Sequence, residues 1–244
     1  MHTPIHLTSS PNIETTKKCP DLEIFSETDR WTLLAASKVT RFRKGQYIWH
    51  DQDNATAVYV VLTGVVQLFG INSKGVMNTN LFVGEPHMFG ELELFAQKTR
   101  CNHAKVLSDS SILEIKKDVF LDLIENNTLY SNWWLKKISS LTFSYSKAKA
   151  HFKGEQPFKK VLAGLGFVMD SMGSHGGTAK ESNNRQIHLN ISQEYFSSFI
   201  GLSRQVANRA LRALEGRGLV TLSYSSITIV NRESIIRLLV DNYY

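Results

Sequence analysis

The stretch of sequence that decides the fold is ISQEYFSSFIGLSRQVANRALRALEGRGL, residues 191–219. Its pattern predicts two short helices joined by a turn, the first over residues 192–200 and the second from residue 204 to about residue 215. Gly201 ends the first helix. Ser203 precedes the second helix, where its hydroxyl oxygen can accept a backbone N–H that has no partner inside the helix.

The second of these helices has one apolar face and one polar face. The apolar residues recur at helical spacing and are Val206, Ala207, Ala210, Leu211 and Leu214. The polar residues are Arg204, Gln205, Asn208, Arg209 and Arg212. Arginine can bind guanine with two hydrogen bonds, and glutamine or asparagine can bind adenine in the same way. A helix that packs on one side and presents such a polar set on the other fits a DNA major groove, whereas the alternative is a helical hairpin with a solvated charged face.

The residues after this helix predict a small β-hairpin. Gly216 and Gly218 mark the end of the helix, because glycine readily adopts the positive φ that follows many helices. Residues 219–223 and 227–230 are typical of two short strands around a turn at residues 224–226. A hairpin in this place is the wing of a winged helix.

Two segments of the chain resemble the CRP/FNR family of bacterial transcription regulators. The first is the pattern G-x-S-R-x-x-x-x-R-x-L-x-x-L-x-x-x-G from Gly201 to Gly218, which resembles the helix-turn-helix of the family. The second is FGELELFAQKTRCNHAKVLSDSSILEI, residues 89–115, which resembles the phosphate-binding cassette of the family and the strands that follow it. The resemblance covers about residues 20–230. It implies an α+β fold with an N-terminal antiparallel β-roll of jelly-roll type, a long dimerisation helix and a C-terminal winged helix-turn-helix, and a DNA-binding regulator rather than an enzyme.

The resemblance divides the chain into four parts. Residues 1–20 are expected to form a flexible lead-in, and residues 21–127 a sensor domain like those that bind cyclic nucleotides. Residues 128–153 are expected to form the dimerisation helix, and residues 154–244 the winged helix-turn-helix domain that binds DNA. The junction at residues 153–154 is the expected hinge.

Short apolar runs separated by turns predict a β domain in the first half of the chain. These runs lie at residues 46–49, 57–62, 65–71, 79–83 and 111–115. Residues 19–37 and 118–126 look helical, and a further amphipathic helix covers residues 158–172. The glycine- and serine-rich residues 173–184 predict a loop, and residues 233–244 predict a final helix that packs on its domain.

One long helix is predicted over residues 128–152. Six of its apolar side chains are spaced 4, 3, 4, 3 and 4 residues apart, which is the spacing of a coiled-coil seam. They are Trp134, Ile138, Leu141, Tyr145, Ala148 and Phe152. Together with the resemblance this seam predicts a homodimer, and the alternative is a helix that packs on its own domain.

Composition and charge favour a cytoplasmic protein that binds nucleic acid. The 244 residues are 42% hydrophobic and carry a net charge of +6. Residues 128–160 hold seven lysines and one acid, and residues 185–217 hold five arginines and two acids. We expect the second cluster to contact phosphate, and the role of the first stays open. Two cysteines, Cys19 and Cys101, are too few for a disulfide framework and fit a reducing cytosol. The sequence has no apolar run of about 18–20 residues and no apolar signal-peptide core.

The resemblance also assigns a sensor site. In family members that bind cyclic AMP, a glutamate of the cassette binds the ribose hydroxyl, and an arginine and a serine bind the phosphate. Glu91 and Arg100 occupy the matching positions, so a cyclic nucleotide is the candidate ligand and no other cofactor is expected. The expected effector pocket consists of Gly90, Glu91, Leu92, Arg100 and Cys101. Three features depart from the family: Glu93 replaces a small residue beside the phosphate, Cys101 replaces the serine, and the loop 96–99 is shorter.

The alternative to a ligand pocket is a closed site, with Glu91 and Arg100 joined in a structural ion pair. Other sensor chemistries of the family need residues that are scarce here. An iron–sulfur cluster needs four cysteines. Haem would have to be held by His87 or Cys101, and a redox role for Cys101 would need its thiol pKa lowered by Arg100 or His103. A cupin-type metalloenzyme is the alternative from a different class, although the chain lacks the close His-x-His spacing of such barrels. Its ligands would be His50, His87, Glu91 and His103.

DNA contacts follow from the resemblance, residue by residue. Arg204 and Arg209 suit guanine and Gln205 suits adenine, so these three are the expected base contacts. The candidates for phosphate contact are Ser192, Gln193 and Ser203, and Asn208 lies on the same polar face. For Arg209 the alternative is a contact with Glu215 or Gln205.

A two-fold dimer presents two such helices about 34 Å apart or a multiple of that distance, so the expected operator is an inverted repeat. RNA polymerase is the expected protein partner. The alternatives for the whole chain are a regulator that works without an effector and a protein-binding module that no longer reads DNA.

Overall fold

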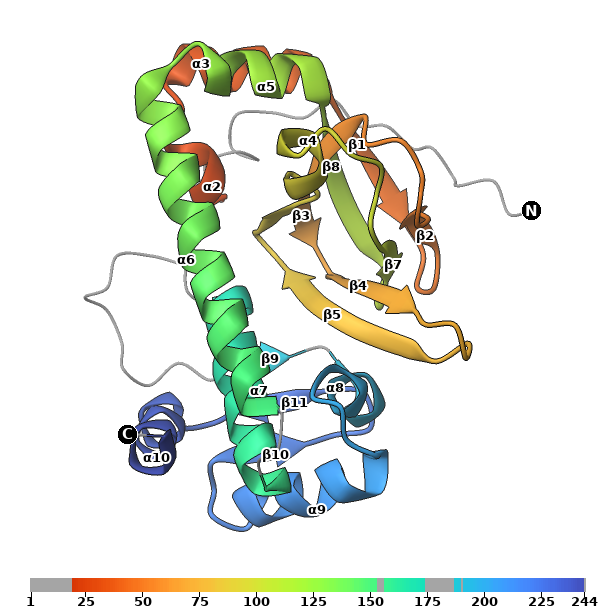
Figure 1. Cartoon of the computed structure of the whole chain (residues 1–244), viewed down its shortest axis with the longest axis vertical. Coiled ribbons are helices and arrows are strands. Elements are labelled where there is room, and N and C mark those ends of the chain that lie inside the picture. Colours follow the sequence, from red (N-terminus) through yellow and green to blue (C-terminus); the bar gives the residue numbers. More distant parts are fainter. Residues whose placement is uncertain (1–18, 153–155, 174–186, 190, 244) are drawn as a thin grey trace. The chain divides into compact units, whose positions relative to one another are not determined.

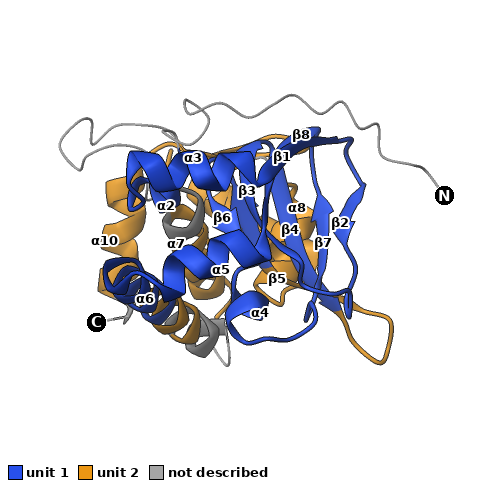
Figure 2. Cartoon of the chain, turned by 90° about the horizontal axis from the view of Figure 1, so that it is seen from above, with its two compact units in different colours: residues 1–70, 81–139 blue, residues 71–80, 140–244 orange. Residues whose placement is uncertain are grey.

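The structure is a computed structural model that describes residues 19–152, 156–173, 187–189 and 191–243 (Figure 1). Residues 1–18 of the expected lead-in, the expected hinge at 153–154 and nearly all of the loop 173–184 lie outside the described residues. The chain forms two compact units, coloured separately in Figure 2. Unit 1 comprises residues 1–70 and 81–139, and unit 2 comprises residues 71–80 and 140–244.

Eight strands build two four-stranded sheets in the first half of the chain, and every strand pair with a recorded register is antiparallel. The strands are β1 (Ser37–Phe42), β2 (Tyr47–Trp49), β3 (Ala57–Thr63), β4 (Val65–Ile71), β5 (Met77–Gly84), β6 (Met88–Phe89), β7 (His103–Val106) and β8 (Ser110–Lys116). One sheet has the order β1-β8-β3-β6, and the other has the order β2-β7-β4-β5. This is the expected β-roll.

Strand β3 shows why these segments read as continuous apolar runs. Val58 and Val60 belong to a core cluster shared with the helices of unit 1. Tyr59 and Val61 belong to a second cluster that also contains residues of the other sheet. Because successive side chains of a strand point to opposite faces, a strand buried on both faces needs apolar residues at every position.

Four short helices and the start of a long one complete unit 1. They are α2 (Pro20–Glu23), α3 (Glu27–Ala35), α4 (Leu92–Phe95), α5 (Lys117–Glu125) and α6 (Thr128–Phe152). The expected helical region 19–37 therefore contains two helices, since Ser26 caps α3 by accepting the backbone N–H of Asp29 at 3.1 Å.

Helix α6 has the predicted bounds, and its seam residues have two different environments. Trp134 is 1% exposed and packs in the core of unit 1, with its ring 5.4 Å from that of Phe120. Ile138 packs against the same core, whereas Leu141 and Tyr145 are 43% and 40% exposed. The side chains of Ala148 and Phe152 lie outside the described part of the structure. Trp134 is thus a residue of its own domain core and is not available to a second chain.

Unit 2 carries the winged helix. Its elements are α7 (Pro157–Gly173), β9 (Ile187–Leu189), α8 (Gln193–Phe199), α9 (Arg204–Glu215), β10 (Val220–Leu222), β11 (Ile227–Ile229) and α10 (Arg232–Tyr243). The wing strands belong to a three-stranded sheet of order β10-β11-β9, in which the sequence did not predict β9. The final helix α10 packs on α7, where the absence of a side chain at Gly166 leaves room for Leu239. No helix among the described residues is long and apolar enough to span a membrane.

Candidate nucleic-acid interface and sensor cassette

The two helices of the helix-turn-helix are fixed by the residues that the sequence singled out. Ser192 caps α8 by accepting the backbone N–H of Tyr195 at 3.3 Å, and Ser203 caps α9 in the same way with Val206 at 3.4 Å. Gly201 lies between them with φ +68°, a conformation that glycine adopts without strain.

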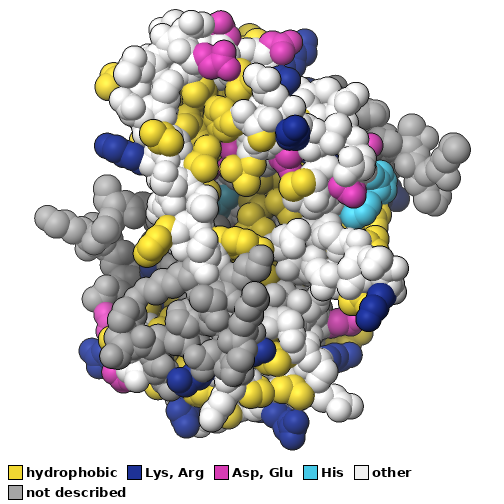
Figure 3. Space-filling model, in the orientation of Figure 1, with side chains coloured by type: hydrophobic (Ala, Val, Ile, Leu, Met, Phe, Trp, Pro, Cys, Tyr) yellow, Lys and Arg dark blue, Asp and Glu magenta, His cyan; other side chains and the backbone are white. Residues whose placement is uncertain are grey.

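Helix α9 is buried on one face and exposed on the other. Its buried residues are Ala207, Ala210, Leu211 and Leu214. The exposed side chains include Arg204, Gln205 and Arg209, the three expected base contacts. Lys and Arg side chains lie along the edge of unit 2 where Figure 1 places α9 (Figure 3). The described surface thus offers guanidinium and amide donors to a partner.

Two residues of the expected DNA-binding set bond to each other. The side-chain amide of Asn208 donates to Oε1 of Gln193, and both side chains are half-buried. Because Gln193 begins α8 and Asn208 lies in α9, this bond joins the two helices. Their role in the structure is to hold the helices in register.

Glu215 pairs with Arg212, and not with Arg209 as in the alternative to base contact. Arg212 Nη1 lies 2.6 Å from Glu215 Oε2, and the backbone N–H of Leu222 donates to Glu215 Oε1 at 2.9 Å. The Leu222 bond, followed by Arg212, lowers the pKa of the Glu215 carboxyl. Among the described residues Arg209 makes no ion pair, so its guanidinium is exposed beside a satisfied Arg212.

The wing ends in an exposed aromatic ring that the sequence analysis placed in the turn without a role. Ser223 and Ser226 close the turn with a backbone bond and a 2.7 Å contact between their hydroxyls. Tyr224 stands between them and is 95% exposed.

In the cassette, Arg100 is enclosed by protein. It is 1% exposed. Its Nη1 donates to the carbonyl of Gly90 at 2.7 Å and to Glu93 Oε2 at 3.2 Å, and its Nη2 donates to the carbonyl of Ala57 at 2.5 Å. The guanidinium carbon lies 4.2 Å from the ring centre of Trp49, a cation–π contact.

Glu93 gathers donors around a single carboxylate. Beside the Arg100 bond, its Oε1 accepts the Cys101 thiol at 3.2 Å and the Cys101 backbone N–H at 3.5 Å. Burial, followed by the Glu93 contact, raises the pKa of the Cys101 thiol to about 11. The lowered thiol pKa that a redox role would need is therefore contradicted. The alternative with an ion pair between Glu91 and Arg100 is also wrong, since Arg100 pairs with Glu93.

Glu91 lies in a second group of buried charges. Burial raises the pKa of its carboxyl, and the nearby positive charge of Lys137 opposes that shift. Lys137 Nζ is 2.6 Å from Asp21 Oδ1, and Asp21 also accepts the backbone N–H of Met88 at 3.1 Å. Sequence reasoning missed Asp21 and Lys137, because they come from α2 and α6 and no spacing along the chain connects them. Leu92, also expected in the pocket, is 55% exposed.

Comparison with known proteins gives the same picture. Residues 39–127 match the family model of the cyclic nucleotide-binding domain, and residues 168–238 match that of the Crp-like helix-turn-helix domain. The anaerobic regulatory protein of Bacillus subtilis is 22% identical over 215 residues, which cover 86% of this chain and 87% of that protein. The cyclic AMP receptor protein of Thermus thermophilus is 28% identical over 199 residues, which cover 77% and 82%. FixK2 from Bradyrhizobium japonicum shares the fold with a TM-score of 0.67, at 20% identity and over 83% of this chain and 96% of FixK2.

The chain belongs to the CRP/FNR family. It is a DNA-binding transcription regulator of CRP/FNR type with a domain of the cyclic nucleotide-binding fold, and it is not an enzyme. The cupin alternative is therefore wrong. In this CRP/FNR protein His50 and His103 do lie close, with ring centres 5.6 Å apart, but the described residues contain no cluster of three or more potential metal ligands.

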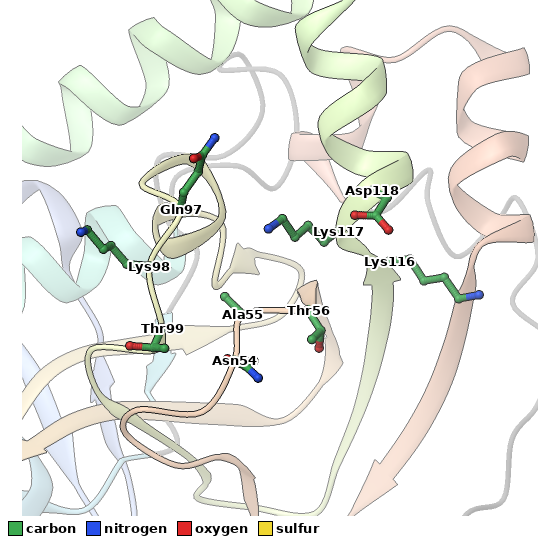
Figure 4. A pocket seen from close by; sticks show the side chains of 9 residues that line it. All are labelled: Asn54, Ala55, Thr56, Gln97, Lys98, Thr99, Lys116, Lys117 and Asp118. Carbon is green, nitrogen blue, oxygen red and sulfur yellow. The ribbon is translucent and has the colours of Figure 1, made fainter.

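A pocket of about 590 Å³ lies on unit 1 of this CRP/FNR protein, beside the cassette loop that precedes Arg100 (Figure 4). It is lined by Asn54, Ala55, Thr56, Gln97, Lys98, Thr99, Lys116, Lys117 and Asp118. None of the five expected effector-pocket residues lines it. The side chains of Lys98 and Lys116 point away from its centre in Figure 4, so its lysines do not converge on one point.

Proposed function

We propose that this CRP/FNR regulator is a cytoplasmic homodimer that binds an inverted-repeat operator through α9 and acts on transcription with RNA polymerase. The observation that carries the proposal is the exposure of Arg204, Gln205 and Arg209 opposite the buried face of α9. The N-terminal residues of a recognition helix are the ones that reach base edges in a major groove.

The three expected base contacts and the two cap serines each have a role that their chemistry supports. Arg204 and Arg209 would each bind a guanine O6/N7 edge, and Gln205 an adenine. Ser192 and Ser203 accept backbone N–H groups with their oxygens, which leaves their hydroxyl hydrogens free to donate to phosphate.

The dimer is supported by exposed apolar side chains on α6, of which Tyr145 also contacts Phe167, with ring centres 6.2 Å apart. The most exposed of them are Leu129, Leu135, Leu141, Phe143 and Tyr145. Exposed rows of large apolar side chains mark interaction surfaces, because their burial removes apolar area from water. We place Leu141 and Tyr145 of the predicted seam at the dimer interface, together with the side of α6 that carries Leu135.

The base contact is tested by Arg209→Ala with Arg212→Ala as its matched control. Both changes remove one guanidinium from the same face of α9, but Arg212 already pairs with Glu215. We expect Arg209→Ala to weaken binding of a selected operator by about tenfold to a hundredfold, equivalent to about 1–3 kcal/mol, and to reduce its preference over a scrambled duplex. Arg212→Ala should weaken both duplexes equally and by less.

Fluorescence anisotropy at fixed salt measures these affinities, since affinity for DNA depends on salt. Circular dichroism and sedimentation of both variants serve to show that folding and assembly are intact. An Arg209→Ala protein that is folded and keeps its operator affinity contradicts the assignment.

A further inference from the structure

We propose that Glu93 is the resident anion of the sensor cassette: its carboxylate occupies Arg100, so the β-roll excludes cyclic nucleotides and the regulator binds DNA without them. This inference deepens the proposed function, on which its last step, DNA binding without a ligand, rests.

The buried charge of Arg100 is balanced by a carboxylate of the same chain. A guanidinium that is 1% exposed needs a counter-charge, because an unpaired buried charge is strongly unfavourable. Glu93, itself 7% exposed, supplies that charge at 3.2 Å. The cation is neutralised by the chain itself.

The Arg100 guanidinium also uses its donors within the chain. Both N–H groups of Nη1 are engaged, one by the Gly90 carbonyl and one by Glu93, and Nη2 bonds the Ala57 carbonyl. Trp49 covers one face of the guanidinium. A phosphate could bond Nη1 only by displacing the Glu93 carboxylate or the Gly90 carbonyl.

The groups that donate to Glu93 are the ones that a ligand phosphate would use. The carboxylate of Glu93 binds an arginine, a thiol and a backbone N–H. In the cyclic-AMP-binding relatives, the resemblance assigns the positions of Arg100 and Cys101 to phosphate recognition. Glu93 therefore takes, from inside the fold, the contacts that a ligand anion would make.

Electrostatic repulsion by Glu93 also excludes a ligand phosphate. A cyclic phosphate placed here would lie within a few ångströms of Glu93 in a buried site, where like charges repel strongly. Because the Glu93 carboxylate is part of the chain, Arg100 is paired whether or not a nucleotide is present. We therefore expect operator affinity to be the same with and without cyclic nucleotide.

The test is calorimetric titration of the full-length protein with cyclic AMP and with cyclic GMP. The wild-type protein should give no binding heat at about 1 mM nucleotide. Glu93→Gly should bind at least one of the two nucleotides with a Kd at least about tenfold below that concentration. The double variant Glu93→Gly with Arg100→Ala should lose this gain. Wild-type binding that Arg100→Ala abolishes overturns the proposal, and so does a folded Glu93→Gly protein that binds neither nucleotide.

A second readout covers the case in which Glu93→Gly does not fold. Glu93→Gln keeps the size of the side chain and removes the charge that raises the Cys101 pKa. Each unit by which that pKa falls raises the thiolate fraction near pH 8 about tenfold, so iodoacetamide should label Cys101 faster in this variant. Cys19, which is 0% exposed, is the internal control. An unchanged rate at Cys101 contradicts the Glu93 contact.

Operator binding without ligand, measured on the same preparations, separates the two proposals. If the wild-type protein does not bind the operator, or binds it no better than Arg209→Ala does, the proposed function is contradicted. The role of Glu93 is decided by the nucleotide titration alone.

Discussion

At the scale of single residues, Glu91 sets a pH response of unit 1. Burial raises the pKa of its carboxyl above the ordinary value of 4.5. The folded protein therefore holds this proton more tightly than the unfolded chain does. The stabilising contribution is complete below about pH 4.5 and is lost as the pH rises through the folded pKa.

Glu91→Gln removes this titration and should reverse the loss. We expect the stability of the variant, relative to wild type, to increase as the pH rises above 4.5 and to level off above the folded pKa. Urea unfolding followed by tryptophan fluorescence measures the free energy of unfolding of unit 1, which contains Glu91, because all four tryptophans lie in that unit. A stability difference that stays flat or falls over this range contradicts the assignment.

Residue chemistry was predictable where it is local. Ser203 caps its helix as its position indicated, and Ser26 and Ser192 cap theirs in the same way. The partner of Arg100 was not predictable, because Glu91 and Glu93 are both near it in sequence and only the turn of the chain through α4 decides which carboxylate reaches the guanidinium.

At the scale of elements, the position of α8 depends on a close approach to α7. Gly164 of α7 faces Ile200 and Phe196, and a side chain built there would lie 3.0 Å from Phe196 Cζ. We expect Gly164→Ala to destabilise unit 2 by about 1–3 kcal/mol through overpacking. Differential scanning calorimetry reports it, since unit 2 contains no tryptophan.

Gly216→Ala is the matched control for this packing. Gly216 has φ −61°, and the nearest atom to an added Cβ is 3.5 Å away, an ordinary van der Waals contact. This substitution should change stability by less than about 0.5 kcal/mol. Equal effects of the two substitutions would mean that α7 and α8 do not pack at Gly164.

The elements that the sequence predicted best are long or strongly patterned. The bounds of α6 and the strand β4 agree with their apolar spacing. Strand β1 escaped prediction because it is an edge strand whose sequence, SKVTRF, has two apolar residues in six, too few to form a pattern. Strand β9 has only three residues.

At the scale of the whole molecule, the proposed dimer is a property that a single chain cannot display. The spacing of α6 predicted one seam, but burial divides it, because the first turns of α6 also complete the core of unit 1 at Trp134. Periodicity shows that a helix face is apolar and leaves open which partner covers it.

Leu141→Asp tests the exposed part of the seam. Leu141 is 43% exposed in the single chain, so a charge there should leave both units folded and convert the proposed dimer to monomer in sedimentation velocity. Ser140→Asp adds the same charge at an exposed neighbour that lies about 100° away around the helix, and it should remain dimeric. A Leu141→Asp protein that stays dimeric refutes this interface.

DNA recognition by the ligand-free regulator is tested most directly by selection from a random pool of DNA duplexes with the full-length protein, without any added ligand. We expect an enriched inverted repeat whose half-sites lie about 10 base pairs apart, or a multiple of that, and whose enrichment is lost with Arg209→Ala. A single unrepeated motif, or enrichment that the Arg209→Ala protein reproduces, would contradict it.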